Sequence, residues 1–103
     1  RRIKIILIKD IQVRICDVFL MYDETHSSAQ EDYLMGSRRT FKVGVNDIAH
    51  WAGIPVSKAD EELERLAERN KIQVFDDYIN VMNIHDIKRI VDAYYNNLDA
   101  KLK

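Results

Sequence analysis

Apolar residues in the first 22 positions of the chain recur at spacings of three and four. They are Ile3, Ile6, Leu7, Ile11, Ile15, Val18, Phe19 and Tyr22. This spacing places the side chains on one face of a helix. Further apolar residues widen that face, as expected for a helix buried on two sides, against its own domain and against a second copy of the chain. A strand over residues 3–8 is the alternative, because β-branched residues dominate there.

Residues 23–39 are polar and contain a Ser-Ser pair and a Gly-Ser pair, which predicts a loop. This loop is long for a compact domain and indicates a functional excursion. Residues 40–43 alternate between polar and apolar positions, which predicts a short strand.

A helix, a sharp turn and a second helix are predicted next. Asn46 is a favourable cap for a helix over residues 47–52, and Gly53 suits the left-handed backbone of the turn. After the Ile-Pro corner, a Ser-x-x-Asp pattern starts a second helix over residues 57–70. The small residue Ala49 allows the second helix to cross close to the first. The expected buried seam comprises Ile48, Ala52, Ala59, Leu63 and Leu66.

Two β-rich runs, residues 72–75 and 78–82, flank the acidic pair Asp76-Asp77 and predict a hairpin. Asn83 then caps a last helix, whose polar tail from Asn96 is expected to fray. The apolar stripe of this helix comprises Ile84, Ile87, Ile90, Val91 and Tyr94.

These elements predict a fold that is mainly α with a small β-hairpin wing (α+β). Their order is that of a winged helix-turn-helix, whose second helix enters the major groove of DNA, preceded here by a long helix of dimerisation type. We expect residues 1–22 to form that helix and residues 23–103 to form one compact unit. A chain of 103 residues that starts with Arg1 is interpreted as a fragment of a longer protein.

The order of these motifs resembles the C-terminal DNA-binding domain of the Crp/Fnr family of bacterial transcription regulators. The resemblance rests on Arg14-Ile15, on residues 43–53, on residues 66–72, on the hairpin and on residues 79–84. It implies a cytoplasmic homodimer, paired through the N-terminal helix, that binds duplex DNA. It also implies an effector, such as a cyclic nucleotide, bound by an N-terminal domain outside this fragment, with no cofactor within the fragment.

The resemblance also suggests which residues contact DNA. Aligned on Gly53, the second helix places Val56, Ser57 and Glu61 where the family has its DNA-reading residues. A shift by one residue brings Ser57 and Lys58 closer to the family's Ser-Arg pair. The expected DNA-binding residues are Asn46, Ser57, Lys58, Glu61 and Arg65, with Arg38, Arg39 and Lys42 as phosphate-facing groups.

Charge favours an alternative. The chain has 16 Lys+Arg and 17 Asp+Glu, a net charge of −1, so it lacks the overall basic charge of most nucleic-acid binders. Carboxylates in the second helix repel phosphates and suit contacts such as accepting a hydrogen bond from cytosine N4. The alternative function is a winged-helix protein-interaction or dimerisation module whose acidic helix faces a basic partner. The basic residues then become ordinary solvated charges, with Arg65 paired to Glu61 at helical spacing.

Other chemistry finds little support in the sequence. The three histidines are far apart with no Cys or His at ligand spacing, so we expect no metal site. Cys16 is predicted to be a small core residue, and Trp51 to pack at a partly exposed position. The paired carboxylates in the loop have no nucleophile beside them, so we expect that the chain is not an enzyme. No apolar run approaches the roughly 20 residues that span a bilayer, so no membrane contact is expected.

Overall fold

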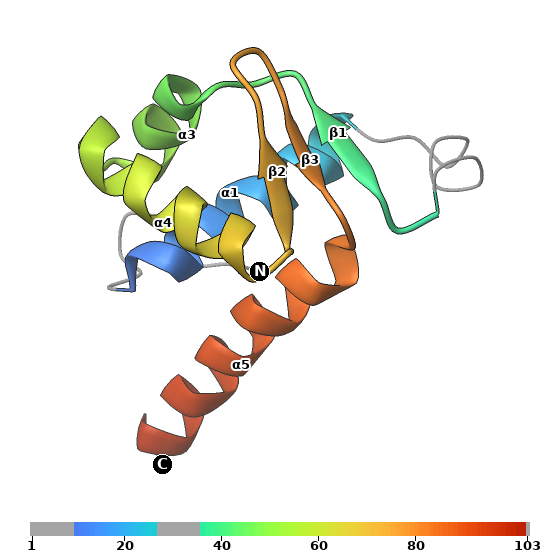
Figure 1. Ribbon diagram of the computed structural model, residues 1–103. Coiled ribbons are helices and arrows are strands. Elements are labelled where there is room, and N and C mark those ends of the chain that lie inside the picture. Colours follow the sequence, from blue (N-terminus) through green and yellow to red (C-terminus); the bar gives the residue numbers. More distant parts are fainter. Residues whose placement is uncertain (1–9, 27–35, 103) are drawn as a thin grey trace.

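The computed structural model describes residues 10–26 and 36–102 (Figure 1). These residues form four helices and a three-stranded antiparallel sheet, which confirms the expected α+β class. The elements are α1 (Ile11–His26), β1 (Arg39–Phe41), α3 (Val45–Ala52), α4 (Val56–Glu68), β2 (Ile72–Val74), β3 (Ile79–Val81) and α5 (Ile84–Leu102). The predictions for residues 1–9 and for most of the 23–39 loop lie outside the described residues.

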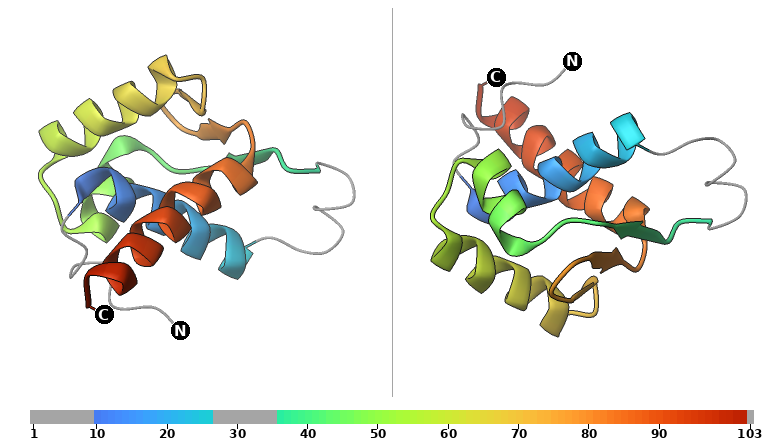
Figure 2. Two further views of the ribbon diagram at one scale, coloured as in Figure 1. Left: turned by 90° about the horizontal axis from the view of Figure 1, so that it is seen from below. Right: turned by 90° about the horizontal axis from the view of Figure 1, so that it is seen from above.

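Helix α1 lies at the centre of the domain, between α5 on one side and the α3–α4 pair on the other (Figure 2). Asp10 starts it by accepting a hydrogen bond from the backbone amide of Val13 at 3.2 Å. Its buried residues are Val13, Ile15, Cys16, Asp17, Val18, Phe19 and Leu20. The chain's own helices therefore cover both sides of α1, and residues 11–20 need no second copy to bury them. The helix also continues to His26, so the expected loop start at residue 23 is wrong.

The sheet has the strand order β1-β3-β2. Strands β2 and β3 form the predicted hairpin, and its two-residue Asp76-Asp77 turn is confirmed by the hydrogen bond from Phe75 N to Tyr78 O at 2.9 Å. Strand β1 adds to the other edge of β3, with Arg39 opposite Val81 and Phe41 opposite Ile79. It occupies residues 39–41 rather than 40–43, because it must stay in register with the three residues of β3.

Two helix starts differ from the sequence-based prediction. Helix α3 begins at Val45, because the side chain of Asp47 accepts from Gly44 N at 3.1 Å. Asn46 is therefore an exposed residue of the first turn rather than the cap. Helix α4 begins at Val56, directly after Pro55, which tolerates a helix start because it has no amide hydrogen to satisfy. It ends at Glu68 instead of Asn70, whose φ of 60° is left-handed.

Helix α5 closes the core against α1. The side chain of Asn83 accepts from His85 N at 2.9 Å, which confirms the predicted cap. Ile84, Ile87 and Val91 are buried, as the apolar stripe predicts. The helix runs to Leu102, past Asn96. None of the helices in the described part of the chain is both long and apolar enough to span a bilayer.

Candidate nucleic-acid interface

A left-handed glycine forms the corner between α3 and α4. Gly53 has φ 68° and ψ 41°, a left-handed conformation that side chains with a Cβ adopt at a cost. Ile54 N donates to Ala49 O at 3.0 Å and so closes the end of α3. All five residues predicted for the seam are buried: Ile48, Ala52, Ala59, Leu63 and Leu66. The corner is held from beneath by α1, since Arg14 Nη2 lies 3.4 Å from Gly53 O.

Helix α4 presents a polar outward face. Its buried residues recur at three- and four-residue spacing, at Ala59, Glu62, Leu63 and Leu66. At 100° per residue, the direction opposite to them is occupied by a second set, Ser57, Glu61, Glu64 and Glu68, all of which are exposed. We call these four residues the outward stripe. Lys58 and Arg65 lie on one flank of the stripe and Asp60 lies on the other. Three of the four residues of the outward stripe are therefore acidic.

A groove of about 570 Å³ separates α4 from the hairpin tip. It brings together two residues predicted to contact DNA, Lys42 and Asn46, with Asp60 of α4 and the turn residues Asp76 and Asp77. The connection between β1 and α3 passes close to the hairpin, because a Cβ added at Gly44 would lie 3.3 Å from Asp76 O. Four carboxylates and one lysine line this groove.

Arg65 does not reach outward as a free cation. Its Nη1 donates to both carboxylate oxygens of Glu62, at 2.8 Å and 3.2 Å, and its Nη2 donates to Glu61 Oε1 at 3.0 Å. The side chain of Glu62 is 12% exposed, whereas those of Glu61 and Arg65 are about half exposed. The pairing of Glu61 with Arg65, expected from their spacing, is present and is extended inward by Glu62.

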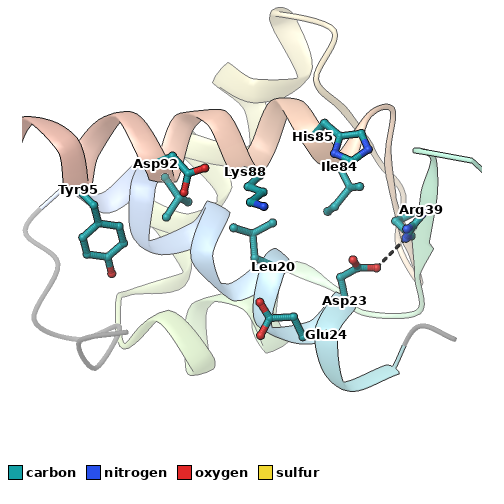
Figure 3. A pocket seen from close by; sticks show the side chains of 10 residues that line it. Leu20, Asp23, Glu24, Arg39, Ile84, His85, Lys88, Asp92 and Tyr95 are labelled. Atoms are coloured by element: carbon teal, nitrogen blue, oxygen red, sulfur yellow. Dashed lines mark hydrogen bonds and ion pairs between the residues drawn. The ribbon is translucent and has the colours of Figure 1, made fainter. Parts of the chain in front are cut away.

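Arg39 is also unavailable to a phosphate. It is 7% exposed, and its Nε donates to Asp23 at 2.7 Å while its Nη1 donates to the carbonyl oxygens of Gly36 and Arg38 (Figure 3). The expectation that Arg39 faces DNA is therefore wrong, because the end of α1 supplies a carboxylate for it. Arg38 is exposed and directly precedes Arg39, which pairs with Val81, whereas Lys42 follows the opposite end of β1.

A second concave region was not foreseen from the sequence. A cavity of about 670 Å³ lies between α1 and α5, and Figure 3 shows Asp23 and Glu24 of α1 facing His85 and Lys88 of α5 across it. Leu20 and other apolar side chains form its floor. These residues come from segments more than 50 positions apart, so no local pattern indicates the cavity. Acidic and basic side chains both line this cavity, so its lining does not match one class of charged ligand.

The remaining candidate residues are structural. Cys16 is buried, as predicted, and burial raises the pKa of its thiol to about 12, with Asp10 adding to the increase. Trp51 is 45% exposed and packs against Tyr22 of α1 with ring centroids 5.8 Å apart. Within residues 10–26 and 36–102, no three His, Cys, Asp or Glu side chains are grouped to hold a metal ion.

The candidate site therefore combines the glycine corner between α3 and α4, a neighbouring hairpin and a mainly acidic outward stripe. Comparison with models of known protein families, with curated proteins and with solved structures gave no match to this chain.

Proposed function

We propose that this chain is the sequence-specific DNA-binding domain of a transcription regulator similar to the Crp/Fnr family. In this proposal α3 and α4 form the helix-turn-helix, α4 is the recognition helix and the β2–β3 hairpin is the wing. The regulator acts as a homodimer on duplex DNA, and Ser57, Lys58 and Asn46 contact phosphates or base edges.

One observation carries the proposal. The left-handed Gly53 turns the chain so that the buried face of α4 packs on α3, while the start of α4 is exposed apart from Ala59 and the hairpin tip lies across a groove from Asp60. A projecting helix of 13 residues fits the major groove, which is about 12 Å wide. The β2–β3 hairpin beside it offers a second contact, to the phosphate backbone of the DNA.

The proposal predicts binding that depends on salt. Neutralised phosphates release counterions, so affinity falls as salt rises. Titration of fluorescent duplex DNA by the chain at low and physiological salt, followed by anisotropy, tests this directly. Salt-sensitive binding supports the proposal, and absence of binding at low salt by a chain that remains folded refutes it.

The acidic outward stripe favours a second candidate, a protein-interaction module with a basic partner. Helix α4 carries five carboxylates and two cations, and Arg65 is already held by two of those carboxylates. A lysine-rich peptide is the probe for this candidate. If the module binds proteins, Glu61→Lys with Glu64→Lys abolishes peptide binding without creating DNA binding. If α4 reads DNA, the same double variant binds DNA more tightly.

A further inference from the structure

We propose that the groove between the hairpin tip and the start of α3 binds an arginine side chain from a basic segment of a partner protein. This inference goes beyond the proposed DNA binding and does not rest on it. It comes from an exposed aromatic pair at the hairpin tip and from the carboxylates that the fold gathers along the same groove.

The hairpin tip gives the groove an aromatic wall. Phe75 lines the groove, although 42% of the residue is exposed to solvent. Tyr78, which is 37% exposed, stacks on its ring with centroids 4.5 Å apart and planes 15° from parallel. The hydrogen bond from Phe75 N to Tyr78 O joins the two residues across the turn. Two large rings gathered at one exposed tip indicate a contact surface, unlike apolar residues scattered singly.

The charge of the groove is strongly negative. Its charged lining residues are Lys42, Asp47, Asp60, Asp76 and Asp77. Within residues 10–26 and 36–102, no ion pair involves any of these five side chains. The carboxylate of Asp47 is held in place, because its Oδ2 accepts a hydrogen bond from Gly44 N at 3.1 Å. Four carboxylates beside a single lysine attract a positively charged occupant.

The rest of the lining favours arginine among the possible cations. A metal ion is a poor match, because no three His, Cys, Asp or Glu side chains in the described part of the chain are grouped to hold one. Val45 and Val74 also line the groove and suit the methylene stem of a long basic side chain. A guanidinium stacks on an aromatic ring and forms two parallel hydrogen bonds with a carboxylate, whereas an ammonium is a compact point charge. Phe75 beside carboxylates therefore matches arginine better than lysine.

The size and charge of the groove match a segment of a protein rather than a single free cation. Its volume is about 570 Å³, within the range of ligand sites. After one arginine is bound, the lining still has more carboxylates than cations, so further basic residues of the same segment find partners. A bound segment also offsets the charge of Asp76 and Asp77. It thereby lowers their repulsion from phosphates, and its binding is compatible with DNA on the neighbouring helix.

Peptide binding tests this inference. The probe is a fluorescein-labelled peptide of alternating glycine and arginine, and its counterpart has lysine at every arginine position. Anisotropy titration with the folded chain at low salt should show saturable binding of the arginine peptide, about 3-fold or more tighter than binding of the lysine peptide. In an NMR titration of the isotope-labelled chain, the largest shifts of backbone amides should fall at residues 44–47 and 74–77.

Two variants and a matched control locate the binding. Phe75→Leu keeps an apolar side chain without the ring and should weaken binding of the arginine peptide about 3-fold or more. Asp76→Asn with Asp77→Asn removes two charges from the turn and should weaken it about 5-fold or more. The control, Glu64→Gln with Glu68→Gln, removes the same charge from the outward stripe, outside the groove, and should change affinity by less than about 2-fold. Circular dichroism checks that each variant is folded.

Four results would overturn the inference. The first is no binding of the arginine peptide by the folded chain. The second is equal affinity for the two peptides, because net charge alone would then explain the binding. The third is an equal loss of affinity in the turn variant and in the control, and the fourth is a set of largest amide shifts within residues 57–68. None of these results bears on the proposed DNA binding, which the titration with duplex DNA tests separately.

Discussion

Replacing Lys58 by Gln should reduce the salt dependence of DNA binding by a predictable amount. Five basic residues are expected near phosphates from the sequence, but Arg39 and Arg65 are held by carboxylates. Arg38, Lys42 and Lys58 are exposed, and no ion pair is found for them within the described residues. Each bound chain therefore has about three cations to offer to DNA.

The magnitude follows from counterion release. Each neutralised phosphate contributes about 0.9 to the slope of log affinity against log salt. Three contacts give a slope of about 2.7 per chain, and affinity should fall about 40-fold between 50 and 200 mM salt. Lys58→Gln should lower the slope to about 1.8, which corresponds to a fall of about 12-fold over the same range.

Fluorescence anisotropy over a series of salt concentrations measures both slopes. Lys88→Gln is the control, because Lys88 is exposed on α5 beside the α1–α5 cavity, away from the helix-turn-helix. Its slope should equal that of the parent chain. An unchanged slope in Lys58→Gln, or an equal decrease in both variants, would refute the assignment of α4 as the surface that meets the phosphates.

Three further predictions concern the fold. Gly53→Ala should lower the free energy of unfolding by about 1 to 2 kcal/mol in a urea titration, because Ala disfavours the left-handed conformation, and Gly53→Asn should lose less. Leu66→Ala should lower the free energy of unfolding by about 2 to 5 kcal/mol, because Leu66 is fully buried and its truncation leaves a cavity. Val56→Ala, at the exposed start of α4, should change it by less than about 0.5 kcal/mol. The Cys16 thiol has a folded-state pKa of about 12 against an ordinary value of 9.0, so only the unfolded chain ionises it between these values. Stability should therefore fall by about 1 kcal/mol from pH 9 to pH 10 relative to Cys16→Ala, and an equal pH dependence in the two proteins would contradict the buried thiol.

The local elements were predictable because they depend on neighbouring residues. The buried seam between α3 and α4 follows from helical spacing, and the position of Gly53 follows from the need for a left-handed turn. The two-residue hairpin turn follows from two β-rich runs separated by an acidic pair. Helix starts were less predictable: Asn46 is a suitable capping residue by type, but Gly44 is the cap, and the side chain of Asp47 three residues later accepts from its amide.

Features that depend on distant residues were not predictable. Strand β1 lies 40 positions before its partner strand, and its register is set by that strand. Arg39 was assigned to the surface because the sequence does not show that α1 continues far enough to place Asp23 against it. The pairing of Arg65 with Glu62 is local, three residues apart on α4, and only the burial of Glu62 depends on how α4 packs in the domain.

The near-neutral charge of the chain bears on how many copies the proposed function requires. A single chain with about three phosphate contacts gains little affinity from counterion release, and the acidic outward stripe opposes part of that gain. Two chains on one site double the contacts, so the slope should rise to about 5.4 and affinity should fall roughly 1,800-fold between 50 and 200 mM salt. The measured slope, compared with the stoichiometry from analytical ultracentrifugation of the complex, therefore distinguishes one bound chain from two. A slope near 2.7 with two chains bound would mean that only half of the six cations assigned to the two chains reach phosphate, and would refute the assignment of these three residues of each chain as phosphate contacts.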